Sequence, residues 1–398
     1  MKIAFVCPAS IPATQFGGIM FLCLDMAREL SELGHDVTIY TTDLDFANNP
    51  KTFNKKLPRV EIYNKIKIVR SHVWCSISLF YINPGMYFQM MKEDFDVIHT
   101  IGIRSFQSIV AAIVSIRKKI PLVISDQGGL TTHPELKQSN IIKKSLFKLQ
   151  TPIIKWIINH AKKISVANEY EKEIFRNFCD ETKIVIVRNG INLNILKTHS
   201  TNVKEKFNIK SEFILFLGRF HVVKGIDVLL KAISLLSNAP EMSSIKVVIM
   251  GVDFGFESKM MKLIDVLGLN EKVIVIKNPS REDVISAYRE CKFLVLPSRW
   301  ELSPLTPLEG FAFEKTVIST NVHGIPFTIK DKENALLVNV EDFNELANSI
   351  IYLVKNQDLC KTYGLSGHKL VQEACNSKKM AEDTLKLYNE IKEITEEK

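Results

Sequence analysis

Two successive series of short apolar runs, each separated by segments with helical periodicity, constrain the fold of this chain most strongly. In the first series the predicted strands are residues 2–7, 36–41, 66–70, 97–100, 122–125, 164–167 and 184–187. A long helical segment, 18–33, follows the first run. Short, continuous apolar strands that alternate with helices indicate a parallel sheet covered on both faces.

The pattern begins again at residue 213. The predicted strands of this second series are 213–217, 246–250, 273–276, 293–296 and 316–319, and its predicted helices are 226–236, 257–267, 281–290, 307–314 and 342–355. We therefore predict an α/β protein with two Rossmann-like, doubly wound parallel-sheet domains that face a cleft. A polar stretch separates domains 1–192 and 193–377, and an amphipathic helix, 378–398, ends the chain.

Composition narrows the class of protein. The seven cysteines are scattered and never in C-x-x-C spacing, which argues against a disulfide framework or a zinc site. The first apolar run is too short for a signal peptide, and we find no run of about 18 apolar residues that would span a membrane. The excess of 52 Lys and Arg over 44 Asp and Glu suits phosphate-bearing ligands or an anionic membrane surface, and it is no signature of nucleic-acid binding. We expect a cytoplasmic protein, with peripheral binding at the inner face of the membrane left open.

The segment 298–326 carries the strongest functional signal. Glu301 follows a predicted strand, and Glu309 falls near the start of the next predicted helix. Open α/β sheets bind ligands at such junctions, and a helix start offers unpaired amides, here those of Leu305 and Thr306, to an anion. The two carboxylates can accept hydrogen bonds from sugar hydroxyls, and the amides between them can bind phosphate. This combination predicts a site for a sugar joined to a nucleotide by a diphosphate. The alternative is that Glu301 caps a helix and Glu309 lies on a solvated face.

Basic residues and glycines mark two further junctions. Arg219 ends the first strand of the second series, and Lys224 opens the next helix. Two cations there can neutralise a diphosphate leaving group, although a solvated basic loop is the alternative. Gly17 and Gly18 lie between the first strand and the first long helix, where the backbone can approach a phosphate closely. Their spacing is not G-x-G-x-x-G, and a plain loop hinge remains open.

Histidines and paired aspartates are weaker candidates. His99 ends a predicted strand and His133 lies in a glycine-rich segment, and either could transfer protons near neutral pH. A lone histidine is more often structural. Residues 43–45 and 94–96 match D-x-D, a pattern that can hold a divalent cation, but we interpret these aspartates as turn and cap residues and expect no metal site.

The segment 137–163 combines lysines with apolar residues at helical spacing. Such a helix can lie in an anionic membrane interface. An ordinary helix pair with one core face explains the pattern equally well.

With these residues placed, the chain resembles the retaining glycosyltransferases of the GT-B fold in family 4, also called group 1. The resemblance covers nearly the whole length and rests on an ordered set of motifs: Gly17-Gly18, Arg188-Asn189-Gly190-Ile191, Gly218-Arg219 with Lys224-Gly225, and Pro297-Ser298 through Gly324-Ile325-Pro326. It implies that residues 1–192 bind the acceptor, that 193–377 bind the donor, and that the last helix crosses back to the first domain.

The resemblance also implies roles for single residues. Arg219 and Lys224 would hold the donor diphosphate, Glu301 would contact the donor sugar, and Glu309 the ribose hydroxyls. The amides of Leu305 and Thr306 would bind phosphate, and the Gly17-Gly18 loop would approach the donor. The catalytic set is thus Glu301, Arg219, Lys224 and His133.

The chain departs from the family pattern at three places. Gln127 occupies a position that is usually histidine, so His133 is only a candidate for that role. Ser303 stands where glycine is common, and Ala312-Phe313-Glu314 replaces Ala-Cys-Gly.

The function implied is transfer of a hexosyl group from a nucleotide-diphospho sugar to a glycan or lipid-linked acceptor, without a metal or another cofactor. The partners would be the donor, the acceptor and an anionic membrane surface at 137–163. Two alternatives stay open. One is a nucleotide-sugar 2-epimerase of the same fold, for which we find no set of acid–base residues. The other is a non-catalytic nucleotide-sugar-binding module.

Overall fold

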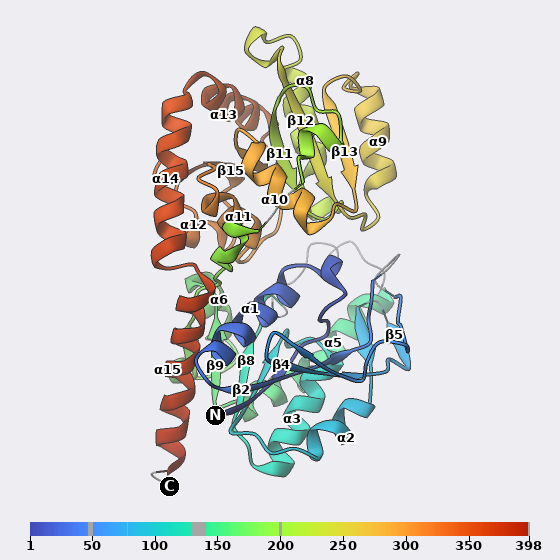
Figure 1. Ribbon diagram of the computed structural model, residues 1–398, viewed down its shortest axis with the longest axis vertical. Coiled ribbons are helices and arrows are strands. Elements are labelled where there is room, and N and C mark those ends of the chain that lie inside the picture. The colour runs from blue at the N-terminus through green and yellow to red at the C-terminus, as the bar shows by residue number, and fades with distance from the viewer. Residues whose placement is uncertain (47–50, 78, 129, 131–140, 199–200, 397–398) are drawn as a thin grey trace. The chain divides into compact units, whose positions relative to one another are not determined.

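The computed structural model describes residues 1–46, 51–77, 79–128, 130, 141–198 and 201–396, and the chain divides into two compact units (Figure 1). Unit 1 consists of Met1–Gly190 and Ser377–Lys398, and unit 2 of Ile191–Asn376. Each unit is built on its own twisted sheet with helices packed against it. Neighbouring strands of both sheets are parallel, with one exception in unit 1 described below.

The sheet of unit 1 has the strand order β10-β9-β8-β7-β1-β2-β4-β3. Its strands are β1 (Lys2–Val6), β2 (Asp36–Thr42), β3 (Val60–Tyr63), β4 (Ile66–Ser71), β7 (Val97–Ile101), β8 (Leu122–Ser125), β9 (Lys163–Val166) and β10 (Ile184–Ile186). The helices are α1 (Gly18–Glu32), α2 (Gly85–Met91), α3 (Phe106–Lys118), α5 (Ile141–His160) and α6 (Glu169–Phe175), and β5 (Cys75–Ile77) pairs with β6 (Phe80–Ile82) in a separate hairpin.

The edge strand β3 is an addition to the predicted parallel set. It runs antiparallel to β4, and the turn between them contains Asn64 and Lys65 with φ of 47° and 67°. Two successive residues with positive φ form the tight turn whose twist matches that of paired antiparallel strands. This local turn places a hairpin at the edge of a sheet that is otherwise parallel.

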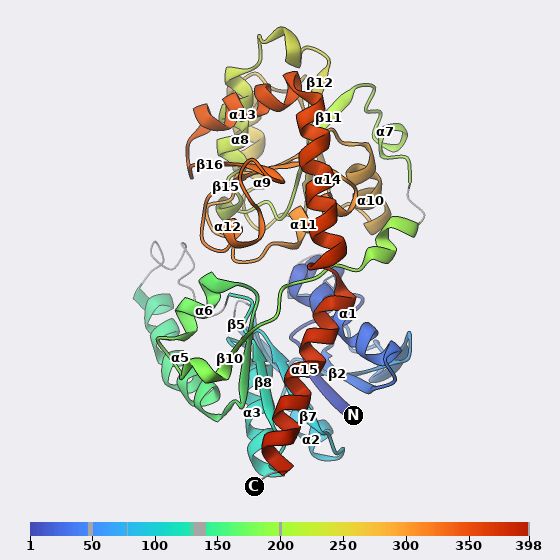
Figure 2. The same cartoon turned by 90° about the vertical axis from the view of Figure 1, so that its left-hand side faces the viewer.

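The last helix, α15 (Ser377–Glu396), belongs to unit 1 although unit 2 precedes it in the sequence. It packs along α1 (Figure 2), and Ser377 Oγ donates a hydrogen bond of 2.6 Å to Glu29 Oε1. Farther along the helix, the buried Tyr388 is hydrogen-bonded to His99 of β7. The chain therefore returns to the first unit at its end.

Unit 2 has the strand order β13-β12-β11-β14-β15-β16. These strands are β11 (Glu212–Leu217), β12 (Ile245–Gly251), β13 (Val273–Lys277), β14 (Leu294–Leu296), β15 (Val317–Thr320) and β16 (Ala335–Val338). The helices are α7 (Val203–Lys206), α8 (Ile226–Leu235), α9 (Glu257–Val266), α10 (Arg281–Glu290), α11 (Leu305–Ala312), α12 (Ile325–Thr328), α13 (Phe343–Lys355) and α14 (Gln357–Glu373). The order reverses between β11 and β14, and open sheets bind ligands at the carboxyl ends of the strands at such a point.

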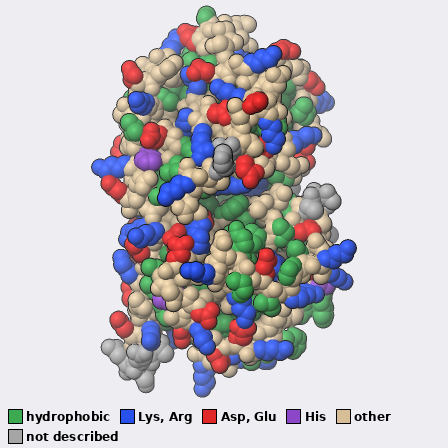
Figure 3. Space-filling view, viewed as in Figure 1, with side chains coloured by type: hydrophobic (Ala, Val, Ile, Leu, Met, Phe, Trp, Pro, Cys, Tyr) green, Lys and Arg blue, Asp and Glu red, His purple; other side chains and the backbone are tan. Residues whose placement is uncertain are grey.

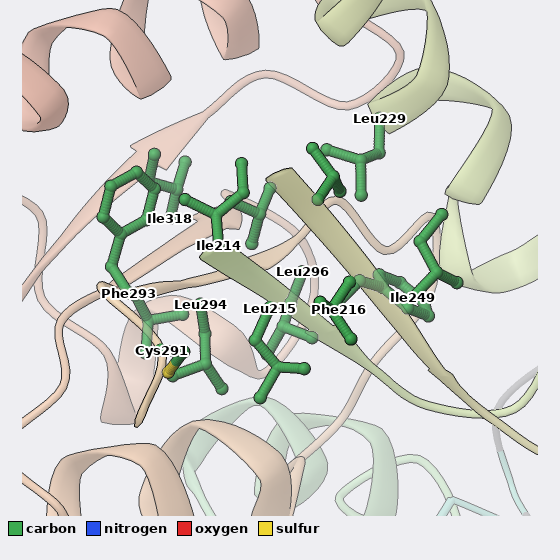
Figure 4. Packing of buried hydrophobic residues seen from close by; sticks show 14 of the residues in the cluster. Ile214, Leu215, Phe216, Leu229, Ile249, Cys291, Phe293, Leu294, Leu296 and Ile318 are labelled. Atoms are coloured by element: carbon green, nitrogen blue, oxygen red, sulfur yellow. The ribbon is translucent and has the colours of Figure 1, made fainter. Parts of the chain in front are cut away.

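The central strands of unit 2 are fixed by an apolar core on both faces of the sheet. Figure 4 shows side chains of β11, β12, β14 and β15 packed together and against Leu229 of α8. Ile214, Leu215 and Phe216 are all buried, which explains why this run shows no alternation of apolar and polar residues. The core holds the carboxyl ends of β11 and β14 next to each other.

Several elements of unit 2 differ from the prediction. Strand β16 and helices α7, α12 and α14 were not predicted, and the helix after β14 begins at Leu305 rather than at residue 307. Pro307 therefore lies in the first turn of α11, where the ring obstructs no preceding helical hydrogen bond.

Candidate functional site

Two loops meet at the point where the strand order of unit 2 reverses. One follows β11 and includes the short 3-10 helix η4 (Val222–Lys224), and the other joins β14 to α11. Lys224 Nζ forms an ion pair with Glu301 Oε1, and the two side chains are 17% and 15% exposed. Ser298 Oγ also donates a hydrogen bond of 3.4 Å to Glu301 Oε1. The structure thus brings together two of the predicted site residues from sequence positions 77 apart.

A pocket open to solvent surrounds this ion pair. It is lined by Phe216, Leu217, Lys224, Leu296, Ser298, Glu301, Pro304, Thr306, Pro307, Ser319 and Ile325. The free space inside it is about 10 Å³, room for about one water molecule. The pocket therefore marks the place where the side chains of Lys224, Glu301 and Thr306 come together.

The amino end of α11 contributes to the same pocket. The helix begins at Leu305, and its N-cap residue is Pro304, which makes no side-chain capping hydrogen bond. The first amides of a helix lack intrahelical acceptors and carry a partial positive charge. Because Thr306 lines the pocket, the first turn of α11 lies where an anion could be bound.

Glu309, farther along α11, is held by α10. Arg281 Nη2 donates to Glu309 Oε1 over 2.6 Å, and Arg281 Nη1 donates to Oε2 over 3.2 Å. The hydroxyl of Tyr288 donates to Oε2 over 2.8 Å. Burial of Tyr288, followed by the charge of Glu309, raises the pKa of this tyrosine well above its usual value. The hydroxyl therefore stays protonated and remains a hydrogen-bond donor.

Arg219 extends from the end of β11 toward the loop after β12. Its guanidinium carbon lies 5.0 Å from the centre of the Phe254 ring, a cation–π geometry. The backbone of Phe254 is fixed to the same loop, because its amide donates to Phe220 O over 3.0 Å. Arg219 thus has an aromatic support that the sequence patterns did not reveal.

The other predicted site residues lie in unit 1 or outside the described residues. Gly17 is the N-cap of α1 with φ of 98°, a conformation that favours glycine. Gly18 begins that helix. His133 lies outside the described residues. Gln127, which stands at the usual histidine position, exchanges two side-chain hydrogen bonds of 3.0 and 3.1 Å with Asn189.

His99 has a structural environment. It is completely buried, with Nδ1 2.6 Å from the Tyr388 hydroxyl and Nε2 2.7 Å from Ser125 Oγ. Burial lowers the pKa of His99 to about 3. The ring is therefore neutral at physiological pH, with one nitrogen donating and the other accepting.

The aspartates of the two D-x-D segments contact residues that are distant in the sequence. Asp43 is buried, lies 2.5 Å from His72 Nδ1, and accepts a hydrogen bond from the amide of Val73. Asp94 pairs with Lys118, and Asp96 accepts a hydrogen bond from the amide of Lys2. These contacts join separate segments of unit 1, and none of them is the turn or cap hydrogen bond that the sequence analysis predicted.

Sequence patterns missed the residues that support the candidate site. Contacts with the predicted site residues or their loops are made by Arg281, Tyr288, Arg299 and Phe254. These contacts join segments that are distant in the sequence. One signal was present, since Arg281 opens a predicted helix that precedes the strand leading to Glu301. Helix order alone does not tell which helix side chains face a neighbouring helix.

The outer face of α5 presents basic and apolar side chains together. Lys148 and Lys155 are exposed, and so are Ile153 and Trp156. Within the described ranges, no helix is long and apolar enough to cross a bilayer. Figure 3 shows Lys and Arg side chains interspersed with Asp and Glu over the visible face of the protein.

Two family models match consecutive parts of the chain. Residues 16–195 match the model described as Glycosyltransferase Family 4, and residues 199–369 match Glycosyl transferases group 1. An uncharacterized glycosyltransferase of Methanocaldococcus jannaschii is 28% identical over 75% of this chain and 77% of the relative. The O-antigen chain mannosyltransferase C of Escherichia coli is 23% identical over 99% of both chains.

Solved structures have the same fold. Sucrose-phosphate synthase from Thermosynechococcus elongatus has a TM-score of 0.76 at 18% identity and covers 98% of this chain and 99% of its own. Anabaena HepE in complex with UDP-glucose has a TM-score of 0.74 at 16% identity and covers 97% of this chain and 99% of its own. Together with the two family matches, these similarities place the chain among the glycosyltransferases of the GT-B fold, with a family 4 domain followed by a group 1 domain.

Proposed function

We propose that this glycosyltransferase moves a hexosyl group from a nucleotide-diphospho sugar to a glycan or lipid-linked acceptor, with retention at the anomeric carbon. The observation that carries the proposal is the Lys224–Glu301 ion pair beside the first turn of α11. A cation and helix amides suit a diphosphate, and a carboxylate suits sugar hydroxyls. The UDP-glucose complex of HepE and the name of the Escherichia coli mannosyltransferase support a donor of this class.

In the proposed reaction each group has one task. Glu301 accepts hydrogen bonds from hydroxyl groups of the donor sugar, since a carboxylate has lone pairs beyond the one that faces Lys224. Lys224 and Arg219 stabilise the negative charge that develops on the leaving diphosphate. A phosphate oxygen of the donor accepts the proton of the acceptor hydroxyl. In this scheme the fixed cations and amides take the part that a divalent cation has in other enzymes.

Binding of the donor class can be tested by thermal shift against UDP-, GDP-, ADP- and dTDP-sugars. Ligand binding to the folded state raises stability by mass action. We expect a shift with one nucleotide class that is reduced in Glu301→Gln and Lys224→Met and is retained in Lys277→Met. Lys277 is a suitable control because it forms an exposed ion pair with Glu257. A wild-type protein that responds to no nucleotide-sugar would contradict the proposal.

Turnover separates transfer from the alternatives. With the donor that binds, the proposed enzyme releases nucleoside diphosphate faster when acceptor is added, and the α-configured donor yields an α-linked product. An epimerase would convert the donor without any acceptor, and a binding module would leave it intact. Glu301→Gln should lower kcat/KM about 10²- to 10³-fold, the range found when one group that stabilises a transition state is removed.

We also propose that unit 1 binds an anionic membrane surface through the outer face of α5. The exposed Lys148 and Lys155 would attract anionic headgroups, and Trp156 and Ile153 would enter the interface. Reversal of both lysine charges to glutamate should weaken flotation with anionic vesicles, whereas neutral vesicles should bind neither protein. Equal flotation of both proteins with anionic vesicles would contradict this proposal and would leave the donor site unaffected.

A further inference from the structure

Arg299 has an acceptor for every N–H of its guanidinium. It lies in the loop between β14 and α11, two residues before Glu301. Nη1 donates to Val222 O over 2.5 Å and to Asp227 Oδ1 over 2.8 Å. Nη2 donates to Asp227 Oδ2 over 2.7 Å and to Glu341 Oε2 over 2.9 Å, and Nε donates to Glu341 Oε1. Five donors in a planar fork are thus matched by acceptors from three other segments.

The backbone of Arg299 joins the same two loops. Its amide donates to Val223 O over 2.7 Å, so both its main chain and its side chain are attached to η4, which ends at Lys224. Lys224 follows Val222 by two residues, and Glu301 follows Arg299 by two residues. The attachment therefore lies directly beside the Lys224–Glu301 ion pair and limits how far its two members can separate.

A second contact brings these loops together independently of Arg299. Gly225 has φ of 67°, and a Cβ added to it would lie 1.9 Å from Pro297 O. The backbone that follows Lys224 is therefore in direct contact with the start of the loop that carries Glu301. Such a close approach requires glycine. The hydrogen bond from the Arg299 amide to Val223 O joins the same two loops two residues away from this contact.

The charges around Arg299 favour a permanent attachment. Burial tends to raise the pKa of Asp227, but the hydrogen bonds and the charge of Arg299 bring that pKa below its usual value. Asp227 therefore stays ionised throughout the neutral range, and arginine is always protonated. The Arg299 side chain is 17% exposed and that of Asp227 is 22% exposed, so solvent screens this pair only partly.

We propose that Arg299 is a positioning residue of the donor site. By holding η4, the start of α8 and the loop before α13 against the β14–α11 loop, it presets the separation of Lys224 and Glu301 for the nucleotide-diphospho sugar. The ligand part of this inference rests on the proposed function, whereas the ordering of the two loops does not. Lysine cannot replace arginine here, because an ammonium group lacks the planar fork that contacts Asp227 and Glu341 together.

Hydrogen exchange tests the ordering of the loops directly. In Arg299→Met we expect amide exchange at least tenfold faster in segments 222–226 and 299–306, with unchanged exchange in α9. Arg289→Met is the matched control, because Arg289 also donates to backbone carbonyls, those of Leu196 and Thr198, outside the candidate site. Unchanged exchange in both segments of Arg299→Met would overturn the inference.

Nucleotide binding tests the positioning role. We expect Arg299→Met and Arg299→Lys to weaken the affinity for the nucleoside diphosphate of the donor at least tenfold, measured by titration calorimetry on folded protein. If Arg299 only stabilised the fold, its replacement and that of Lys224 would change the affinity independently. If Arg299 positions Lys224, the loss of affinity caused by Lys224→Met should be at least fivefold smaller in the Arg299→Met background than in the wild type. Affinity within twofold of the wild type, or independent effects, would overturn the inference. If the wild type bound no nucleotide, the proposed function would fail, and hydrogen exchange would still decide whether Arg299 orders the loops.

Discussion

The carboxylate of Glu309 faces the guanidinium of Arg281 across α10 and α11, with Arg281 Nη2 2.6 Å from Glu309 Oε1 and Nη1 3.2 Å from Oε2. Tyr288, in the last turn of α10, adds a third donor to the same carboxylate. The predicted ribose-binding glutamate is therefore also a structural link between two helices. Changes at this position should alter both stability and ligand binding.

Replacement of Glu309 by alanine should destabilise unit 2. The change removes the carboxylate that accepts hydrogen bonds from Tyr288 and Arg281, and the Tyr288 hydroxyl keeps the longer contact of 3.4 Å with Thr306 O. The loss of hydrogen bonds to a charged group usually reduces stability by about 1–3 kcal/mol. Thermal unfolding should show a lower Tm for Glu309→Ala even without ligand, and Glu309→Gln should recover part of the loss. An unchanged Tm in Glu309→Ala would show that the helix pair does not depend on this link. Thermal shifts caused by nucleotide-sugars must accordingly be compared with the Tm of each variant alone.

Gly225 and Gly268 offer a matched pair of substitutions. Both have positive φ, 67° and 65°, but only Gly225 would place a Cβ against backbone, 1.9 Å from Pro297 O. For Gly268 no atom lies within 4 Å of the added Cβ. Gly268→Ala should therefore reduce stability by roughly 1 kcal/mol from backbone strain alone, and Gly225→Ala by clearly more. Equal free energies of unfolding for the two variants would contradict the close contact between the loops.

Local sequence patterns were sufficient to predict the α/β fold and the two strand–helix junctions that carry Lys224 and Glu301. Continuous apolar runs such as 213–217 predict buried parallel strands, and the strand–helix junctions near Lys224 and Glu301 predict a ligand-binding edge. The partners of these residues could not be predicted in the same way. The contacts of Arg299 with Asp227 and of Glu309 with Arg281 join segments 72 and 28 residues apart, and only the packed strand order brings those segments together.

The last helix shows the limit of periodicity taken alone. Amphipathic periodicity predicts a helix over 378–398 but not what its apolar face covers, and it was the family resemblance that implied its return to the first domain. Its partners are α1 and the buried His99. From the sequence, His99 was a candidate for proton transfer because it is a titratable residue at the end of a strand. In the structure it is buried and contacts Ser125 and Tyr388, which indicates a structural role.

Tyr388→Phe should weaken the attachment of α15. The change removes the hydroxyl that contacts His99 Nδ1 and leaves a buried ring nitrogen without that partner, a loss of about 1–3 kcal/mol. We expect faster hydrogen exchange in α15 and a lower Tm, with a smaller effect for the exposed Tyr352→Phe. Exchange in α15 that matched the wild type would contradict a role for the His99–Tyr388 contact. The pH profile of activity should be the same in both proteins, because the pKa of His99 lies at about 3.

Glu171 makes unit 1 sensitive to pH. Its side chain is buried in α6, where Oε2 accepts a hydrogen bond from the amide of Ala167. Burial raises the pKa of Glu171 to about 7; the Ala167 hydrogen bond opposes this shift, and the charge of Asp126 adds to it. The folded protein therefore holds a proton between about pH 4.5 and pH 7 that the unfolded chain has released, so stability falls as pH rises through this window.

Glu171→Gln should remove this dependence because the amide has nearly the same shape and does not ionise. A pKa shift of about this size corresponds to roughly 3 kcal/mol between the two ends of the window. The variant should therefore gain stability relative to the wild type at pH 8 and show little gain at pH 4.5, measured by urea unfolding with a probe in unit 1. Glu173→Gln is the control, since its side chain lies on the same helix, is 62% exposed and pairs with Arg176. If Glu171→Gln and the wild type lost stability in parallel between these pH values, the proton would be held by another group.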